Sequence, residues 1–283
     1  MKPATDQAAR RIVKLTLAVL LIELFVLLLR SWLQTVLASD GMSAAVAKDL
    51  SYLIVPPLLL LLLMPLANDV LPAFRGRFRW RQLTVRTVVV ALGLGVAVRL
   101  ATWGVLIAAV SFRLVANDDP GAIPGPLIDW NCPPPYVAAL NLLVMALLTP
   151  FVEEVINRGL FLTWLLRFGR PCAVLASSLL FALAHRPGSM GSALVFGLLV
   201  GVLYLNTGSL WGPVLAHGTA NALVLLDWQC LNAVWNPAEV TNALRAVGAL
   251  AAVLAASSFA LACLLVSKRV AGEEPPGDPP TGH

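Results

Sequence analysis

Residues 136–166 read YVAALNLLVMALLTPFVEEVINRGLFLTWLL, an apolar stretch long enough to cross a membrane as a helix. Its middle carries two adjacent carboxylates, Glu153 and Glu154, and the guanidinium of Arg158. A charge at the centre of a membrane helix costs about 2.5 to 3.5 kcal/mol on insertion scales. We therefore expect these three side chains to belong to a functional site at membrane depth.

The whole chain resembles this stretch in composition. Of its 283 residues, 59% are hydrophobic and 12% are charged, whereas about 25% of the residues in soluble globular proteins are charged. This composition excludes an ordinary soluble protein and predicts an all-α fold, a polytopic transmembrane helical bundle in one domain over residues 1–271. The tail at 272–283 is rich in Pro, Gly and Glu, which predicts a disordered cytoplasmic segment.

The hydropathy pattern predicts about eight spans. They cover residues 12–29, 50–68, 87–112, 137–166, 172–187, 190–206, 210–226 and 244–266. If both termini are cytoplasmic, all the large basic clusters lie on that side, so the net charge of +5 reflects orientation and indicates no nucleic-acid partner. The connections at 113–135 and 227–243 then share the outer face, and residues 31–47 form a short interfacial or outer segment.

Five further residues carry separate predictions. Cys132 and Cys230 fall in the two outer connections, where they form either a disulfide or two free thiols. Glu23 and Arg99 lie at nearly equal depth, which suggests an ion pair between their helices or a role for Arg99 in binding a terminal carboxylate. Pro150 can kink its helix because proline lacks a backbone N–H.

The spacing of the polar residues predicts different roles for them. Glu154 and Arg158 are four residues apart and share a helix face, so an ion pair between them can offset part of the cost of burial. Glu153 points about 100° away and is available as a general base. His217 and Asn221 also share a face, and an imidazole and a carboxamide presented together can donate hydrogen bonds to a developing oxyanion.

Each residue taken alone has a plainer interpretation. A Glu followed one turn later by an Arg is usually structural, and a membrane histidine or Asn221 usually joins helices by hydrogen bonds. Glu153, His185 and His217 could also form a zinc site with an open position. Because no His-Glu-x-x-His helix is present and the ligands would come from three helices, a metal-independent reaction without a cofactor is the favoured prediction.

Three motifs occur in order within apolar segments: Glu-Glu-x-x-x-Arg at 153–158, Phe-x-x-x-His at 181–185 and His-x-x-x-Asn at 217–221. Together they resemble the CPBP family of intramembrane proteases, which includes the CAAX-type prenyl proteases and bacterial relatives tied to bacteriocin processing and self-immunity. The resemblance covers residues 153–221, and the first four spans share only general hydrophobicity with the family. Few Lys beside many Ala, Leu, Val and Arg are typical of a GC-rich bacterial genome, which suggests a bacterial inner or plasma membrane.

The resemblance implies that Glu153 activates water and that His185 helps to hold it. Glu154 and Arg158 would be the accompanying motif pair. The same resemblance assigns the stabilisation of the tetrahedral intermediate to His217 and Asn221. The candidate catalytic set is therefore Glu153, Glu154, Arg158, His185, His217 and Asn221.

The predicted function is that of an integral membrane endopeptidase that cleaves hydrophobic or lipidated C-terminal tails of protein substrates by glutamate-activated water. Its partners would be such a protein or peptide and membrane lipid. A proton-coupled transporter could use the same acidic and imidazole groups as a relay. A non-catalytic scaffold that binds hydrophobic tails is the third hypothesis, and Glu153→Gln distinguishes it because a scaffold keeps its binding function.

Overall fold

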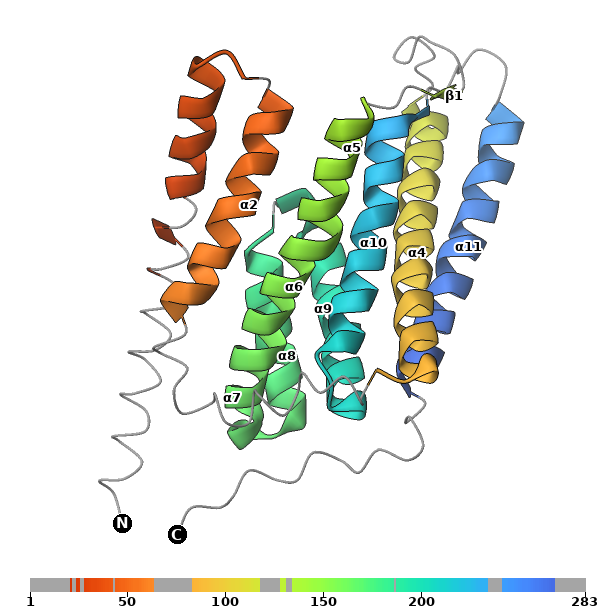
Figure 1. Cartoon of the computed structure of the whole chain (residues 1–283). Coiled ribbons are helices and arrows are strands. Elements are labelled where there is room, and N and C mark those ends of the chain that lie inside the picture. The colour runs from red at the N-terminus through yellow and green to blue at the C-terminus, as the bar shows by residue number, and fades with distance from the viewer. Residues whose placement is uncertain are drawn as a thin grey trace.

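A computed structural model describes residues 21, 24–25, 28–42, 44–63, 83–117, 128–130, 134–185, 187–233 and 241–267. Most of these residues are helical, and the helices form one bundle (Figure 1). The elements are α2 (Ala44–Leu63), α4 (Val85–Asn117), β1 (Ile128–Trp130), α5 (Pro135–Asn141), η4 (Leu142–Leu148), α6 (Thr149–Glu154), η5 (Val155–Leu162), α7 (Thr163–Leu165), η6 (Leu166–Phe168), α8 (Arg170–Leu183), η7 (Pro187–Ser189), α9 (Met190–Thr207), α10 (Trp211–Cys230), β2 (Leu231–Ala233) and α11 (Thr241–Ser267).

Large apolar side chains cover the outside of the described helices, and the charged pair of the central stretch lies inside. Leu250 is 70% exposed and Leu183 is 66% exposed, whereas Glu154 and Arg158 are completely buried. This arrangement suits hydrocarbon as the surrounding solvent, because exposed leucine is favourable there and charge is not.

Four described stretches are long and apolar enough to cross a membrane: Val85–Ala109, Pro135–Phe168, Met190–Thr207 and Gly248–Val266. They coincide with four of the predicted spans, so the prediction of a transmembrane helical protein is confirmed over these residues. The apolar helix Arg170–Leu183 is shorter, and α10 occupies the segment predicted at 210–226. The spans predicted at 12–29 and 50–68 extend beyond the described residues, and the tail at 272–283 lies outside them.

Two features differ from the sequence-based predictions. β1 and β2 pair in an antiparallel ribbon with Asp129 opposite Asn232, and hydropathy gives no signal for such a short pairing between distant connections. In addition, residues 31–47 do not form a separate segment. Residues 28–39 are helical, a turn follows at Asp40, and α2 then begins at Ala44.

The span Pro135–Phe168 enters the π-helical register twice. η4 and η5 are π-helical and flank the short α6, which ends with the two glutamates. At the end of η4 the N–H of Thr149 donates to Val144 O, five residues back rather than four. The helix stops at Gly169, whose φ of 92° is a left-handed conformation that favours glycine. π-Helical turns within a helix are frequent at functional sites.

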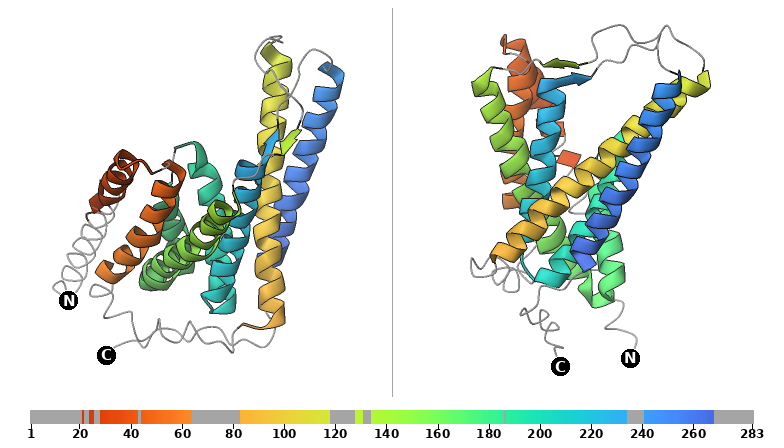
Figure 2. Two further views of the ribbon diagram at one scale, coloured as in Figure 1. Left: turned by 45° about the horizontal axis from the view of Figure 1, so that its top comes forward. Right: turned by 90° about the vertical axis from the view of Figure 1, so that its right-hand side faces the viewer.

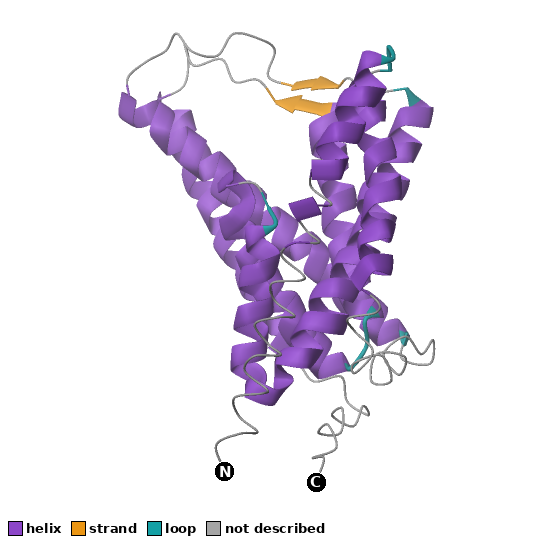
Figure 3. Cartoon of the chain, turned by 90° about the vertical axis from the view of Figure 1, so that its left-hand side faces the viewer, coloured by secondary structure: helices purple, strands orange, loops and turns teal. Residues whose placement is uncertain are grey.

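Small residues let α10 approach its neighbours closely. A Cβ added to Gly218 would lie 2.5 Å from Ala146 O in η4, and one added to Gly95 in α4 would lie 2.5 Å from Ala216 O. α4 and α11 pack along each other and lean away from α5 and α10 toward the end that carries β1 and β2 (Figures 2 and 3). The span Pro135–Phe168 is called the glutamate helix below. α10 is therefore held between the glutamate helix on one side and α4 on the other.

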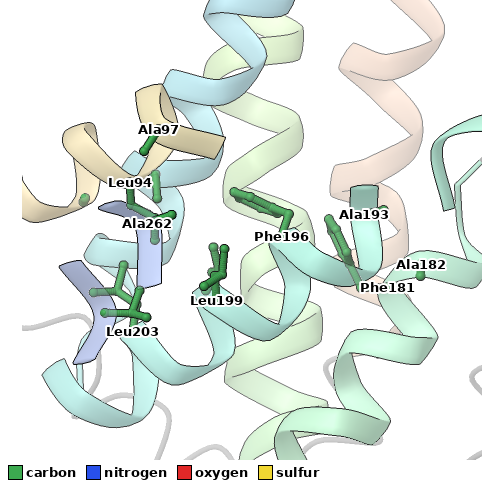
Figure 4. Packing of buried hydrophobic residues seen from close by; sticks show 13 residues of the cluster. Leu94, Ala97, Phe181, Ala182, Ala193, Phe196, Leu199, Leu203 and Ala262 are labelled. Carbon is green, nitrogen blue, oxygen red and sulfur yellow. The ribbon is translucent and has the colours of Figure 1, made fainter. Parts of the chain in front are cut away.

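A buried apolar cluster joins α4, α8, α9, α10 and α11 beside this contact. Leu94 and Ala97 of α4, Leu199 and Leu203 of α9 and Ala262 of α11 belong to it (Figure 4). Its other end is formed by the rings of Phe181 and Phe196, which lie next to each other between α8 and α9. These two rings form the boundary between the apolar cluster and the polar residues of the span Pro135–Phe168.

Gly218→Ala should separate α10 from η4, because the new methyl group meets a backbone oxygen that cannot move aside. Overpacking of this kind typically costs about 1 to 3 kcal/mol. We expect a lower melting temperature in detergent. Gly191→Ala is the matched control, since nothing lies within 4 Å of a Cβ there. Equal melting temperatures for the two variants would show that the close approach is unimportant.

Candidate active site

The buried centre of the site is the ion pair predicted between Glu154 and Arg158. Arg158 Nε lies 3.1 Å from Glu154 Oε2, and Nη1 lies 3.3 Å from Oε1. Both side chains are completely buried. Arg158 Nη2 also donates to Gly197 O of α9 at 3.1 Å, and its Cζ lies 4.8 Å from the centre of the Phe181 ring. The pair therefore joins the glutamate helix to both α8 and α9.

His217 of α10 lies between the two carboxylates. Its Nδ1 is 2.9 Å from Glu154 Oε1, and its Nε2 is 3.8 Å from Glu153 Oε2. The first distance is a hydrogen bond, which Nδ1–H donates to the carboxylate, whereas the second is too long for one.

The two adjacent glutamates have different environments. The side chain of Glu153 is 33% exposed and that of Glu154 is completely buried, because they point in different directions from the same helix. Glu154 is engaged by Arg158 and His217. The carboxylate of Glu153 is thus the accessible one of the two.

Phe181 and Phe196 enclose the imidazole of His217. The Phe181 ring lies 5.6 Å from it, edge to face, and the Phe196 ring lies 5.1 Å from it. Phe181 also stacks against His185 at 4.6 Å. Sequence reasoning quoted Phe181 within its motif without giving it a role, and it did not single out Phe196. The only signal available was the aromatic residue one turn before His185.

His185 reaches the site through Phe181 rather than through a carboxylate. Its Nδ1 lies 2.8 Å from Phe181 O, and because a carbonyl can only accept, Nδ1 carries the proton and Nε2 is the nitrogen left for other partners. Within the part of the chain that the structure describes, no three His, Cys, Asp or Glu side chains form a group that could hold a metal. The zinc set of Glu153, His185 and His217 therefore does not fit this geometry, and no step below runs through a metal.

Asn221 donates from Nδ2 to Met145 O of η4 at 2.8 Å. This carbonyl needs a donor from outside its helix. The N–H of Thr149 goes to Val144 O, so the next N–H in the π-helical register belongs to residue 150, which is a proline. Asn221 thus lies one turn from His217, as predicted, but in this structure its amide satisfies backbone that Pro150 leaves unpaired.

Other predicted partners are not brought to the site by described residues. Arg99 lies with its Cζ 5.6 Å from the Trp103 ring in α4. Glu23 and the side chains of Cys132 and Cys230 fall outside the described residues, so the ion pair with Arg99 and the disulfide stay predictions.

Residues 135–223 match the family model described as Type II CAAX prenyl endopeptidase Rce1-like. The match spans both glutamates, His185, His217 and Asn221. This segment is an Rce1-like domain of the CPBP family. The family consists of membrane glutamate proteases, and membership implies an intramembrane protease that cleaves C-terminal tails. No curated protein and no solved structure matched the chain.

The buried ion pair predicts different stability effects for two neighbouring substitutions. Glu154→Gln leaves Arg158 without its counter-charge, and breaking a buried pair in this way costs about 3 to 5 kcal/mol. Glu153→Gln alters a partly exposed group and should leave the melting temperature in detergent nearly unchanged. Thermal unfolding of the two purified variants beside the unsubstituted protein checks this. An equal loss in both variants would contradict the division between the two carboxylates.

Proposed function

We propose that the Rce1-like domain cleaves hydrophobic or lipidated C-terminal tails of protein substrates with Glu153 as the general base. The observation that carries this proposal is the accessible carboxylate of Glu153 beside the buried Glu154–Arg158 pair, with His217 between the two glutamates. A scaffold that only binds tails does not need an accessible base next to a fixed imidazole. A proton relay could use the same carboxylates and imidazole, and the comparison of C-termini at the end of this subsection distinguishes it from a protease.

In the proposed reaction, Glu153 takes a proton from a water placed between its Oε2 and His217 Nε2. The water oxygen bonds to the carbonyl carbon of the scissile peptide, and the π electrons of that carbonyl move to its oxygen. The C–N bond then breaks, and Glu153 returns the proton to the leaving nitrogen. His185 offers its Nε2 as a further partner that helps to hold the water.

His217 and Asn221 would stabilise the oxyanion of the intermediate by donating hydrogen bonds. With Nδ1–H held by Glu154, His217 donates through Nε2 when its ring carries both protons.

The buried position of the site supports a hydrophobic substrate. Glu153 lies near the middle of the apolar stretch Pro135–Phe168, so a peptide that reaches it must pass among apolar side chains. A hydrophobic or lipidated tail gains from this burial, whereas a polar tail loses its hydration.

We also propose one domain over residues 1–271 with about eight spans, in a bacterial inner or plasma membrane, and with both termini cytoplasmic. Three basic helix ends lie at the same end of the bundle (Figure 1). They are the start of α4 with Arg86, the α7–η6 end with Arg167 and the start of α8 with Arg170. Arg167 Cζ lies 3.8 Å from the Trp164 ring, a combination typical of a membrane interface. These charges support a cytoplasmic location for that end.

Glu153→Gln should abolish cleavage, since loss of a general base typically lowers the rate by about 10² to 10⁴. The measurement compares membrane proteomes of cells that carry the unsubstituted protein, Glu153→Gln or the control Asp40→Asn, and identifies C-termini by mass spectrometry. Asp40 is an exposed carboxylate at a turn outside the site. We expect a defined set of C-termini to disappear in Glu153→Gln alone, at equal protein level. Unchanged termini with a persistent loss-of-function phenotype would favour the scaffold or transport hypothesis.

A further inference from the structure

The two π-helical segments of the glutamate helix are each followed directly by a threonine. Thr163 follows η5, and its Oγ1 donates to Arg158 O, five residues back, at 2.9 Å. Because that hydroxyl proton is used, the Tyr204 hydroxyl donates to Thr163 Oγ1 at 2.9 Å. In this segment the threonine hydroxyl is thus bonded to a backbone carbonyl of the π-helical turn.

Thr149 follows η4 in the same way, yet its hydroxyl is unused. The residue is only 4% exposed, and Oγ1 has no hydrogen-bond partner among the residues that the structure describes. A buried hydroxyl without a partner is rare and asks for an explanation. The carbonyl four residues back, which a helical threonine commonly uses, is Met145 O. That oxygen is already the acceptor for Asn221 Nδ2.

Thr149 lies on the side of its helix that faces α10. Met145, four residues before it, is bonded by Asn221, and Glu153, four residues after it, lies beside His217. Four residues are about one helical turn, so Thr149 is one turn from each of these contacts. Thr149 and Asn221 are therefore two donors next to one carbonyl, and only Asn221 is using it.

We propose that Thr149 is a positioning residue that exchanges with Asn221 on Met145 O during the reaction. This rests on the proposed function, in which Asn221 donates to the oxyanion. When the Asn221 amide leaves Met145 O for the intermediate, Thr149 turns about χ1 and donates its hydroxyl to that carbonyl. Threonine in helices has two accessible rotamers for such bonds. One hydrogen bond replaces another, so the backbone next to Pro150 stays satisfied while Asn221 donates to the oxyanion.

Thr149→Val removes the hydroxyl and keeps the shape. Without the exchange, each turnover would leave Met145 O unpaired, so we expect kcat to fall about 10-fold to 100-fold with KM nearly unchanged. Thr149→Ser keeps the hydroxyl and should retain most of the activity. The assay uses proteoliposomes and a fluorescence-quenched peptide that ends in a prenylated cysteine and three further residues, with Glu153→Gln as the inactive reference.

Melting temperatures in detergent provide a second readout. Thr149→Val loses no hydrogen bond of the resting protein, so its melting temperature should be unchanged, whereas the control Thr163→Val loses one and should melt lower. In an Asn221→Ala background, Thr149 can take Met145 O at rest. There, Thr149→Val should lower the melting temperature, a coupling that arises only if the two side chains share Met145 O as their acceptor.

The outcomes separate the two proposals. If the unsubstituted protein cleaves the peptide, Glu153→Gln is inactive and Thr149→Val has an unchanged kcat, the exchange is wrong and the proposed function stands. If the unsubstituted protein leaves the peptide intact, the proposed prenyl substrate is wrong and the exchange is judged by the melting temperatures. The absence of coupling between Thr149→Val and Asn221→Ala overturns it.

Discussion

The pairing of Glu154 with Arg158 inside a membrane helix is the constraint on which the rest of the structure depends. Two full charges at this depth are tolerable only as a pair whose remaining hydrogen-bonding groups are occupied. Arg158 donates to Gly197 O in α9, and Glu154 accepts from His217 in α10. Satisfying one ion pair thus fixes the positions of two other helices, and with them the imidazole beside Glu153. The helix arrangement and the chemistry of the site have the same physical origin.

The irregular backbone of the glutamate helix is likewise satisfied by hydrogen bonds from protein side chains. π-Helical turns and a proline free carbonyl oxygens that a membrane cannot hydrate, so irregular backbone persists there only where protein groups satisfy it. Met145 O receives the amide of Asn221, and Arg158 O receives the hydroxyl of Thr163. Both irregular segments flank the glutamates. The residues that satisfy them tie the helix to α10 and, through Tyr204, to α9.

Two adjacent carboxylates that point in different directions give the site its asymmetry. Glu154 is buried and bonded, and Glu153 is accessible and near an imidazole without a direct hydrogen bond. This asymmetry supports the proposal that one carboxylate holds the helices and the other receives a proton. The rings of Phe181 and Phe196 fix the imidazole from the apolar side, so the His217 ring has little freedom to move away from Glu153.

Local spacing and composition determined the membrane class, four of the helices, the pairing of Glu154 with Arg158 and the separation of Glu153 from that pair. These properties follow from helical periodicity and hydropathy, which depend only on neighbours along the chain. Tertiary structure decided the rest. The bond from Asn221 to Met145 O, the contact of Phe181 with His217, and the pairing of β1 with β2 all join segments separated by other elements. Hydropathy contains no information about which helices touch, and the unusual acceptor at Met145 exists only because Pro150 and the π-helical register coincide there.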